Sequence, residues 1–160
     1  MQPVTYTPIG VIHTPFKDAA GMPIQPRSAE GVAGMVELYP PYAAGLKDLD
    51  GFSRIILVYH FHRCEGWSAE LVPFLDTRPR GVFSTRAPRR PNPIGISIVG
   101  LTRIDGTVLT IEGADMLDGT PLLDIKPYIP EFDSFCEEKT GWLPEHPDIR
   151  NARSDGRFVR

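Results

Sequence analysis

Apolar residues in this chain form short runs that alternate with polar positions, which is the pattern of β-strands. Val, Ile, Thr and Phe dominate these runs, and such side chains pack well on a pleated surface. The pattern predicts seven strands: Tyr6–Thr14, Gly34–Leu38, Ser53–Phe61, Gly81–Thr85, Ile94–Ile104, Val108–Gly113 and Leu122–Ile125. Asp105 and Gly106 stand between two of these strands and predict a tight hairpin turn, because both residues accept positive φ.

Helical patterns are few. Only Tyr42–Leu49 and Ser68–Leu75 predict short helices, and the first is expected to end at Asp50-Gly51, where glycine can take the left-handed conformation. Strand and helix do not alternate regularly, and no GxGxxG follows the first strand, so a Rossmann-type sheet is not expected. Closure of the strands removes exposed edges. We therefore predict an all-β fold, a compact single barrel with short helices.

Composition supports one domain with short elements. The 160 residues include 15 glycines and 17 prolines, a density that leaves little room for long helices. No apolar run approaches the roughly 20 residues of a spanning helix, and the N-terminus lacks the pattern of a signal peptide, so a cytoplasmic protein is expected. Residues 1–138 are expected to form the barrel domain. Residues 139–160 are expected to form a polar, arginine-containing tail, either flexible or folded against a partner.

Charge is unevenly distributed along the chain. The formal net charge is −3, which argues against a surface that binds nucleic acid throughout. Between Asp76 and Asp105, however, there are six arginines and no acidic residue, whereas from Asp105 to Glu138 nine acids stand against the single Lys126. The arginine-rich stretch is therefore a local basic feature in an acidic protein.

The arginine-rich loop STRAPRRPNPIG, residues 84–95, is the strongest single motif. Its three prolines fix backbone torsions and restrict the residues before them. The loop is therefore stiff and presents Arg86, Arg89, Arg90 and Asn92. Guanidinium groups bind phosphate or carboxylate through two parallel hydrogen bonds. From charge alone, recognition of such a ligand and pairing with the acidic segment after Asp105 stay equally open.

Two histidines, His60 and His62, end the most apolar predicted strand on one face. A metal site would need a third or fourth ligand, and neither His13 nor His146 stands in a ligand pattern. Packing or ligand contact is the favoured role, and we assign no metal.

Three aspartates, Asp115, Asp118 and Asp124, offer carboxylates for hydrolysis. The stretch from Asp118 to Pro121, DGTP, is first of all a turn. Cys64 and Cys136 match no zinc or redox spacing, so we assign them no chemistry.

Five segments, taken in order, resemble the TrmO-type (YaeB/TsaA-like) tRNA methyltransferases, and they cover most of the first 135 residues. They are PIGVIHTPF (8–16), MPIQP (22–26), FSRIILVYHFH (52–62), GVFSTRAPRRPNPIGIS (81–97) and DGTPLLDIKPYIP (118–130). The resemblance implies a homodimeric β-barrel enzyme that binds S-adenosylmethionine near the protomer interface. It also implies methylation of N6 of the threonylcarbamoylated adenosine next to the anticodon of a threonine tRNA.

The resemblance further implies which residues contact the cofactor. They are Gln25, Pro26, Arg27, Phe61, His62, Arg63, Arg86, Ile96, Leu117, Asp118, Gly119 and Thr120. Methyl transfer from a sulfonium needs an aligned acceptor and uptake of a proton, and requires no metal. We expect Asn92, held between Pro91 and Pro93, to be the catalytic hydrogen-bond acceptor for the exocyclic amine. This expectation follows Asn-Pro motifs in unrelated adenine N6-methyltransferases.

Four further arginines are expected to bind the tRNA backbone and to make binding depend on salt: Arg78, Arg80, Arg89 and Arg90. Longer family members carry an additional C-terminal domain, whereas this sequence ends at Arg160. The short form would then methylate a different acceptor or use residues 150–160 for docking. Two other functions stay open: a non-catalytic RNA-binding β-barrel, and a metal-dependent hydrolase that uses His60 and His62.

Overall fold

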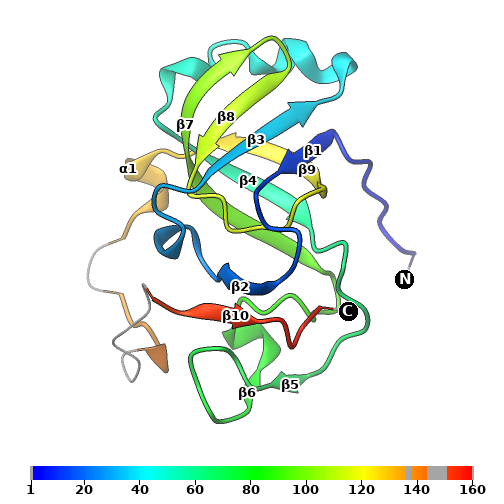
Figure 1. The fold of residues 1–160 in the computed structure, drawn as a ribbon, viewed down its shortest axis with the longest axis vertical. Coiled ribbons are helices and arrows are strands. Elements are labelled where there is room, and N and C mark those ends of the chain that lie inside the picture. The colour runs from blue at the N-terminus through cyan, green and yellow to red at the C-terminus, as the bar shows by residue number, and fades with distance from the viewer. Residues whose placement is uncertain (1, 136–137, 144–150, 160) are drawn as a thin grey trace.

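The computed structural model describes residues 2–135, 138–143 and 151–159. Its centre is a closed barrel of six antiparallel strands in the order β1-β3-β8-β7-β4-β9, which confirms the predicted fold class (Figure 1). The barrel strands are β1 (Gly10–His13), β3 (Ala33–Leu38), β4 (Arg54–His60), β7 (Ile94–Asp105), β8 (Val108–Glu112) and β9 (Thr120–Pro127).

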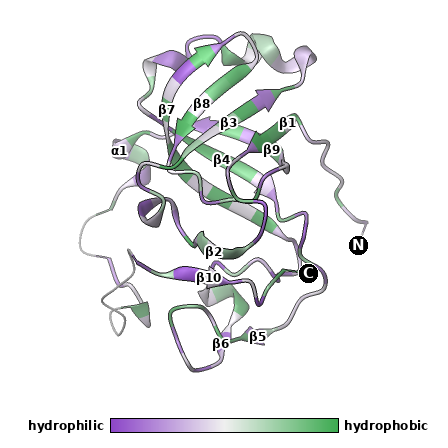
Figure 2. Ribbon diagram, in the orientation of Figure 1, coloured by the Kyte–Doolittle hydropathy of each residue, from purple (hydrophilic) through white to green (hydrophobic). Residues whose placement is uncertain are grey.

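Alternation along each strand places one set of side chains inside the barrel. In β4, Ile55, Leu57 and Tyr59 are buried while the residues between them are partly exposed. The fully buried apolar side chains come from all six strands: Ile12, Val36, Ile55, Leu57, Val99, Leu109, Ile111 and Leu122. Each such side chain stabilises the fold by about 1.5–3 kcal/mol relative to exposure. Figure 2 shows hydrophobic residues along the barrel strands and a hydrophilic β10 (Arg153–Asp155).

Two small antiparallel sheets lie below the barrel in Figure 1. In one, β2 (Ala20–Pro23) pairs with β10; in the other, β5 (Glu70–Leu71) pairs with β6 (Arg80–Gly81). These sheets were missed from sequence because each strand is short and lacks a regular apolar pattern. They build the irregular part of the molecule that surrounds one end of the barrel.

Helices are short throughout the described residues. They are the 3₁₀ helices Pro26–Ser28, Pro40–Leu46, Leu49–Gly51 and Val82–Ser84, and α1 (Pro130–Asp133). None of the helices in the described part of the chain has the length and apolar character needed to cross a membrane.

Four local predictions were wrong. The strand expected at Gly81–Thr85 is a 3₁₀ helix after its first residue, because the Ser84 and Thr85 hydroxyls donate to the carbonyls three residues earlier. The helix expected at Ser68–Leu75 is absent; the segment holds the short β5, and Pro73 disfavours a helix.

The helix expected at Tyr42–Leu49 is instead a 3₁₀ helix from Pro40 to Leu46. The left-handed residue after it is Asp48, with φ of 65°, and not Gly51. The predicted first strand was also too long, since β1 begins only at Gly10. The Asp105-Gly106 hairpin was predicted correctly, with Gly106 at a φ of 61°.

The end of the expected C-terminal tail folds against the chain itself. β10 pairs with β2, and Phe158 is buried with its ring centroid 4.9 Å from that of Phe74. Arg157 lies over the Phe74 ring and forms an ion pair with Asp155. Cys136, His146, Arg150 and Arg160, which figured in the sequence predictions, lie outside the described residues.

A close contact inside the barrel requires glycine at one position. The Tyr59 ring lies against Gly95, its partner across β4 and β7, and a Cβ atom added at Gly95 would overlap that ring. Tyr59 is itself buried, so its ring has no free direction in which to move.

Replacing Gly95 with alanine is therefore expected to lower the free energy of unfolding by about 3 kcal/mol, at the upper end of overpacking effects. Denaturant titration measures the change. Gly45→Ala is the matched control, because nothing lies within 4 Å of a Cβ at that position; it should change stability by no more than about 0.5 kcal/mol. Equal effects of the two substitutions would contradict the packing argument.

Candidate functional site

The end of the barrel where β4 stops and β7 begins collects most of the predicted site residues. His60 pairs with Ile94, and the Phe61 amide donates to the Pro93 carbonyl at 2.8 Å. This bond ties the proline-stiffened loop to the end of β4. The loop and the strand end, thirty residues apart in sequence, thus form one edge of the site.

Gln25 and Arg86 form the first cluster. The Arg86 guanidinium donates to the Gln25 side-chain oxygen at 2.8 Å, across 61 residues of sequence. Gln25 precedes the 3₁₀ helix Pro26–Ser28, whose first residue lies under Gly113. The structure therefore joins two segments that the sequence predicted to share one ligand.

The turn Leu117–Thr120 forms the second cluster with the end of β4. The Thr120 hydroxyl donates to the Leu117 carbonyl at 2.7 Å and lies 3.4 Å from Nδ1 of His62. Gly119 closes the turn with a φ of 75° and donates its amide to the Ile12 carbonyl. Burial, followed by the charge of Arg63, lowers the pKa of His62 below its usual value, so the ring is neutral at pH 7.

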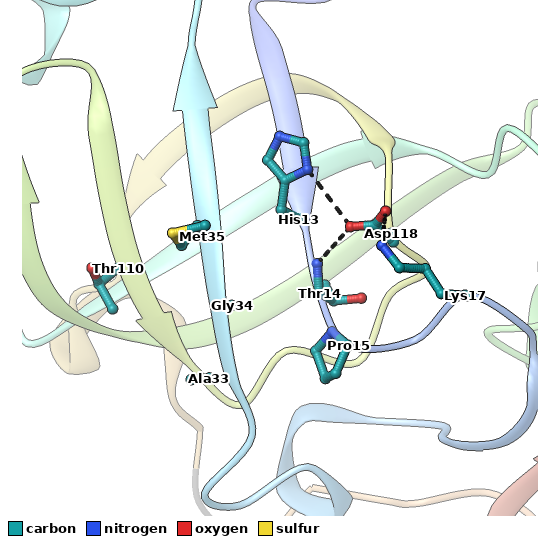
Figure 3. A pocket seen from close by; sticks show the side chains of 9 residues that line it. All are labelled: His13, Thr14, Pro15, Lys17, Ala33, Gly34, Met35, Thr110 and Asp118. Atoms are coloured by element: carbon teal, nitrogen blue, oxygen red, sulfur yellow. Dashed lines mark hydrogen bonds and ion pairs between the residues drawn. The ribbon is translucent and has the colours of Figure 1, made fainter.

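Asp118 anchors this turn to the segment after β1. Its carboxylate accepts from the Thr14 amide at 3.1 Å and pairs with Lys17 and with His13 (Figure 3). The hydrogen bond from Lys17 holds the pKa of Asp118 below its usual value. Arg63 joins the same group through a 2.8 Å bond to the Lys17 carbonyl.

An open groove of about 570 Å³ borders Asp118 on the outer face of β1, β3 and β8. Its lining residues are His13, Thr14, Pro15, Lys17, Ala33, Gly34, Met35, Thr110 and Asp118 (Figure 3). His13, Met35 and Thr110 stand in register on the three strands, and half of Met35 is exposed. Only Asp118 belongs to the predicted cofactor contacts, so the groove is a neighbouring hollow.

A buried chain of polar groups lies beneath the first cluster. The Ser97 hydroxyl donates to Oδ1 of Asp115 at 2.6 Å, and the Tyr59 hydroxyl lies 3.0 Å from the Ser97 oxygen. Asp115 is only 8% exposed, and this burial raises its pKa to about 7. Burial also raises the pKa of Tyr59, while the nearby Arg86 charge opposes both shifts.

These three residues were not predicted as a group. Ser97 is a polar residue at an inward position of β7, between Gly95 and Val99, and Asp115 interrupts a run of buried residues. Both polar residues could be recognised in the sequence, because each stands in an apolar stretch. The sequence analysis considered Asp115 only as a carboxylate for hydrolysis, because nothing in the sequence shows that it lies next to Ser97.

Several predicted residues lie apart from these clusters. Ile96 points outward from β7 and is 51% exposed, whereas its neighbour Ser97 points inward. Asn92 is exposed in the turn before β7, where its carbonyl accepts from the Ile94 amide at 2.7 Å. Arg27 is also exposed.

The four predicted RNA contacts have different surroundings. Arg78 is exposed. Arg80 pairs with Asp76 and lies over the ring of Trp142. Arg90 donates to two carbonyls of its own loop. Arg89 is half-buried.

The metal-site alternative finds no support in the described residues. Among them, no three His, Cys, Asp or Glu side chains are placed to hold a metal ion. Asp124, one of the three aspartates considered, pairs with Lys126 on β9. Cys64 is a free thiol whose pKa burial raises to about 11, which disfavours the reactive thiolate.

Comparisons with known proteins identify relatives over nearly the whole chain. Residues 11–134 match the family model described as the tRNA-methyltransferase O N-terminal domain. A probable S-adenosyl-L-methionine-binding protein of Pyrococcus abyssi is 50% identical, over 97% of this chain and 85% of the relative. The tRNA (adenine(37)-N6)-methyltransferase of Escherichia coli is 34% identical, over 96% of this chain and 70% of the enzyme.

A solved structure shares the fold of this chain. The crystal structure of TrmO from Pseudomonas aeruginosa matches with a TM-score of 0.75 and 36% identity. The match covers 88% of this chain but 63% of the solved one, so the chain spans less than two thirds of that protein.

The buried Asp115 carboxyl generates a prediction about stability and pH. Its pKa is higher in the folded chain than in the unfolded one, so the proton stabilises the fold at low pH and this stabilisation is lost as pH rises toward 7. Asp115→Asn stays neutral. The difference in free energy of unfolding, variant minus parent, should therefore rise by about 2–3 kcal/mol between pH 5 and pH 8. Denaturant titration at both pH values measures this; a difference that does not change with pH would contradict the assignment.

Proposed function

The chain belongs to the TrmO family of tRNA methyltransferases, and from this premise we propose that it transfers a methyl group from S-adenosylmethionine to an adenosine of tRNA. The observation that carries the proposal is that the Gln25–Arg86 pair meets the Leu117–Thr120 turn: Arg86 interacts electrostatically with Asp115, two residues before that turn. These are the segments that the resemblance assigns to the cofactor. The non-catalytic RNA-binding alternative does not account for their convergence.

The chemistry of these groups fits the cofactor. S-adenosylmethionine supplies an activated methyl group on a sulfonium centre, together with a carboxylate, an amine and an adenosine. The Arg86 guanidinium is suited to a carboxylate, and Gln25 offers both a donor and an acceptor. Phe61 and Leu117 add apolar surface, while the turn from Asp118 to Thr120 adds backbone and hydroxyl partners.

Asn92 is proposed to act on the acceptor. In a threonylcarbamoylated adenosine the lone pair of N6 is delocalised into the ring and into the carbamoyl carbonyl. The Asn92 side-chain oxygen, accepting a hydrogen bond from the single N6–H, would draw the lone pair back onto nitrogen, and the proton would leave to solvent as the N–CH3 bond forms and the S–CH3 bond breaks. Pro91 and Pro93 limit the movement of the turn, and the 2.7 Å bond from Ile94 to its carbonyl holds it.

The RNA strand is proposed to pass over the basic loop and the groove beside Asp118. The groove has the size of a small-molecule site, and Lys17 at its edge carries a positive charge. The exposed Arg78 is free to face solvent, and we retain Arg80, Arg89 and Arg90 as further phosphate contacts. We propose the threonylcarbamoylated adenosine next to the anticodon of threonine tRNA as the acceptor.

The outer face of β4 and β7 supports the proposal of a homodimer. Ile94, Ile96 and Ile98 are 40%, 51% and 37% exposed and lie in register with His60, Val58 and Ile56. A second copy would cover this apolar surface. Ile96 is a predicted cofactor contact that faces away from the other clusters. In a homodimer the Ile96 side chain would lie at the interface and would contact a cofactor bound between the two copies.

The domain division also remains a proposal. Residues 1–138 would form the catalytic barrel, and residues 139–160 would add a docking surface for RNA, with Arg153 exposed on β10. A tRNA-modifying activity would place the protein in the cytoplasm.

The direct test is methylation of tRNA. Threonine tRNA that carries threonylcarbamoyladenosine, incubated with the protein and S-adenosylmethionine, should gain one methyl group at that nucleoside, as measured by mass spectrometry of digested RNA. Asn92→Ala should lower turnover about 100-fold or more with little loss of cofactor binding. Asn92→Asp, which keeps an acceptor oxygen, should retain more activity.

Unchanged turnover in Asn92→Ala would remove Asn92 from the mechanism. Cofactor binding without methylation of this tRNA would keep the enzyme class and discard the target.

The dimer has its own test. Ile98→Asp places a charge in the apolar face and should convert a dimer into a monomer in analytical ultracentrifugation. Its affinity for S-adenosylmethionine should fall as well. Thr102→Asp, at an exposed position further along β7, is the matched control and should stay dimeric. A parent chain that sediments as a monomer would contradict the proposal.

A further inference from the structure

Positive charge dominates the predicted cofactor contacts. Arg27, Arg63 and Arg86 are all exposed at this end of the barrel. The carboxylate among those contacts, Asp118, is already paired with Lys17 and His13. A ligand that carries a cationic centre therefore finds little unpaired negative charge among the predicted contacts themselves.

Asp115 differs from Asp118 in its surroundings. Its hydrogen-bond donor is the neutral hydroxyl of Ser97, which Tyr59 supports from β4. It sits in the buried segment directly before the Leu117–Thr120 turn. The Arg86 charge reaches it, since Arg86 lowers the pKa of both Asp115 and Tyr59. Asp115 is thus a fixed carboxyl close to the predicted cofactor contacts. Its hydrogen-bond partner, Ser97, is neutral and does not cancel the negative charge of Asp115.

The methyl donor and its product differ by one unit of charge. S-adenosylmethionine has a sulfonium, whereas S-adenosylhomocysteine has a neutral thioether, and their other groups are the same. Arginines that bind the shared carboxylate do not favour the donor over the product, because their positive charge repels the sulfonium. A buried negative charge can, because charges interact more strongly in a medium of low dielectric constant than in water.

This inference rests on the proposed function. We propose that the buried carboxylate of Asp115, held in place by Ser97 and Tyr59, is the specificity-determining group that makes the site bind the cationic methyl donor in preference to the neutral product. The enzyme would then release the product after transfer because the charge that matched Asp115 has left the cofactor.

The ionisation of Asp115 makes the selectivity depend on pH. Its pKa lies at about 7, and the groups packed against it are Tyr59 from β4, Ser97 from β7 and Arg86 from the loop before β7. Above pH 7 the carboxyl is charged, and preference for the donor is greatest. Below pH 7 it is neutral, and the preference decreases. Because a bound cation stabilises the charged form, binding of the donor near pH 7 should release a proton.

The experiment is calorimetric titration of the full chain with S-adenosylmethionine and with S-adenosylhomocysteine, at pH 6 and pH 8. In the parent chain the ratio of the two affinities should be higher at pH 8. Asp115→Asn should lower the ratio at pH 8 on the order of tenfold, because it removes one unit charge from a site of low effective dielectric constant. The ligands' own amino groups titrate in both proteins, so the difference between parent and variant isolates Asp115.

Two further variants sharpen the test. Asp105→Asn removes the same charge from an exposed position, eight residues or about 26 Å along β7 from Ser97, and should leave the ratio unchanged. Ser97→Ala removes a hydrogen bond that lowers the pKa of Asp115, so the pH transition in the ratio should move to higher pH. A purely structural role of the network does not predict the shift of the pH transition in Ser97→Ala.

The outcomes separate this inference from the proposed function. If the parent chain binds both ligands and Asp115→Asn leaves their ratio and the proton release unchanged, Asp115 does not select the donor, and the methyltransferase proposal stands. If the parent chain binds neither ligand, the cofactor assignment fails and the inference fails with it. If the variant does not fold, the parent chain still tests the inference: an affinity ratio that is the same at pH 6 and pH 8 would overturn it.

Discussion

The hydrogen-bonded chain from Tyr59 through Ser97 to Asp115 is the constraint on which this molecule depends. It places three polar groups in a largely apolar interior, where an unpaired polar atom would cost about 1–3 kcal/mol. Their mutual bonds of 3.0 and 2.6 Å satisfy them. The same geometry requires Gly95, because the Tyr59 ring occupies the space of a side chain at that position.

The predicted site residues contact the Tyr59–Ser97–Asp115 chain from two sides. Asp115 leads directly into the turn that ends at Thr120, and that turn contacts His62 at the end of β4. On the other side, Arg86 bonds to Gln25 and interacts electrostatically with Asp115. A rigid interior thus positions two loops whose own secondary structure is irregular. Because the barrel holds both loops, side chains from distant segments can lie together in the proposed site without long helices.

Sequence analysis predicted the barrel because alternation reports directly which side chains face inward, as in β4 and β8. It predicted the site segments through family resemblance, and the structure brings Gln25 to Arg86 and His62 to Thr120. It missed what depends on the third dimension. The pairing of β10 with β2 joins strands with no apolar pattern, and the buried Asp115 is linked through Ser97 to Tyr59, 56 positions earlier. In the same way, side-chain hydrogen bonds to local carbonyls give a 3₁₀ helix at Val82–Ser84, where the sequence predicted the strand Gly81–Thr85.

The central claim is that this end of the barrel is a cofactor site arranged around the Asp115 network. A crystal structure of the chain with S-adenosylmethionine tests it most directly. The account predicts the cofactor carboxylate against Arg86 and Gln25, its sulfonium on the side of Asp115, and Ile96 in contact with it at an interface between two copies. Cofactor density confined to the groove beside Met35, away from Arg86 and Asp115, would contradict the account.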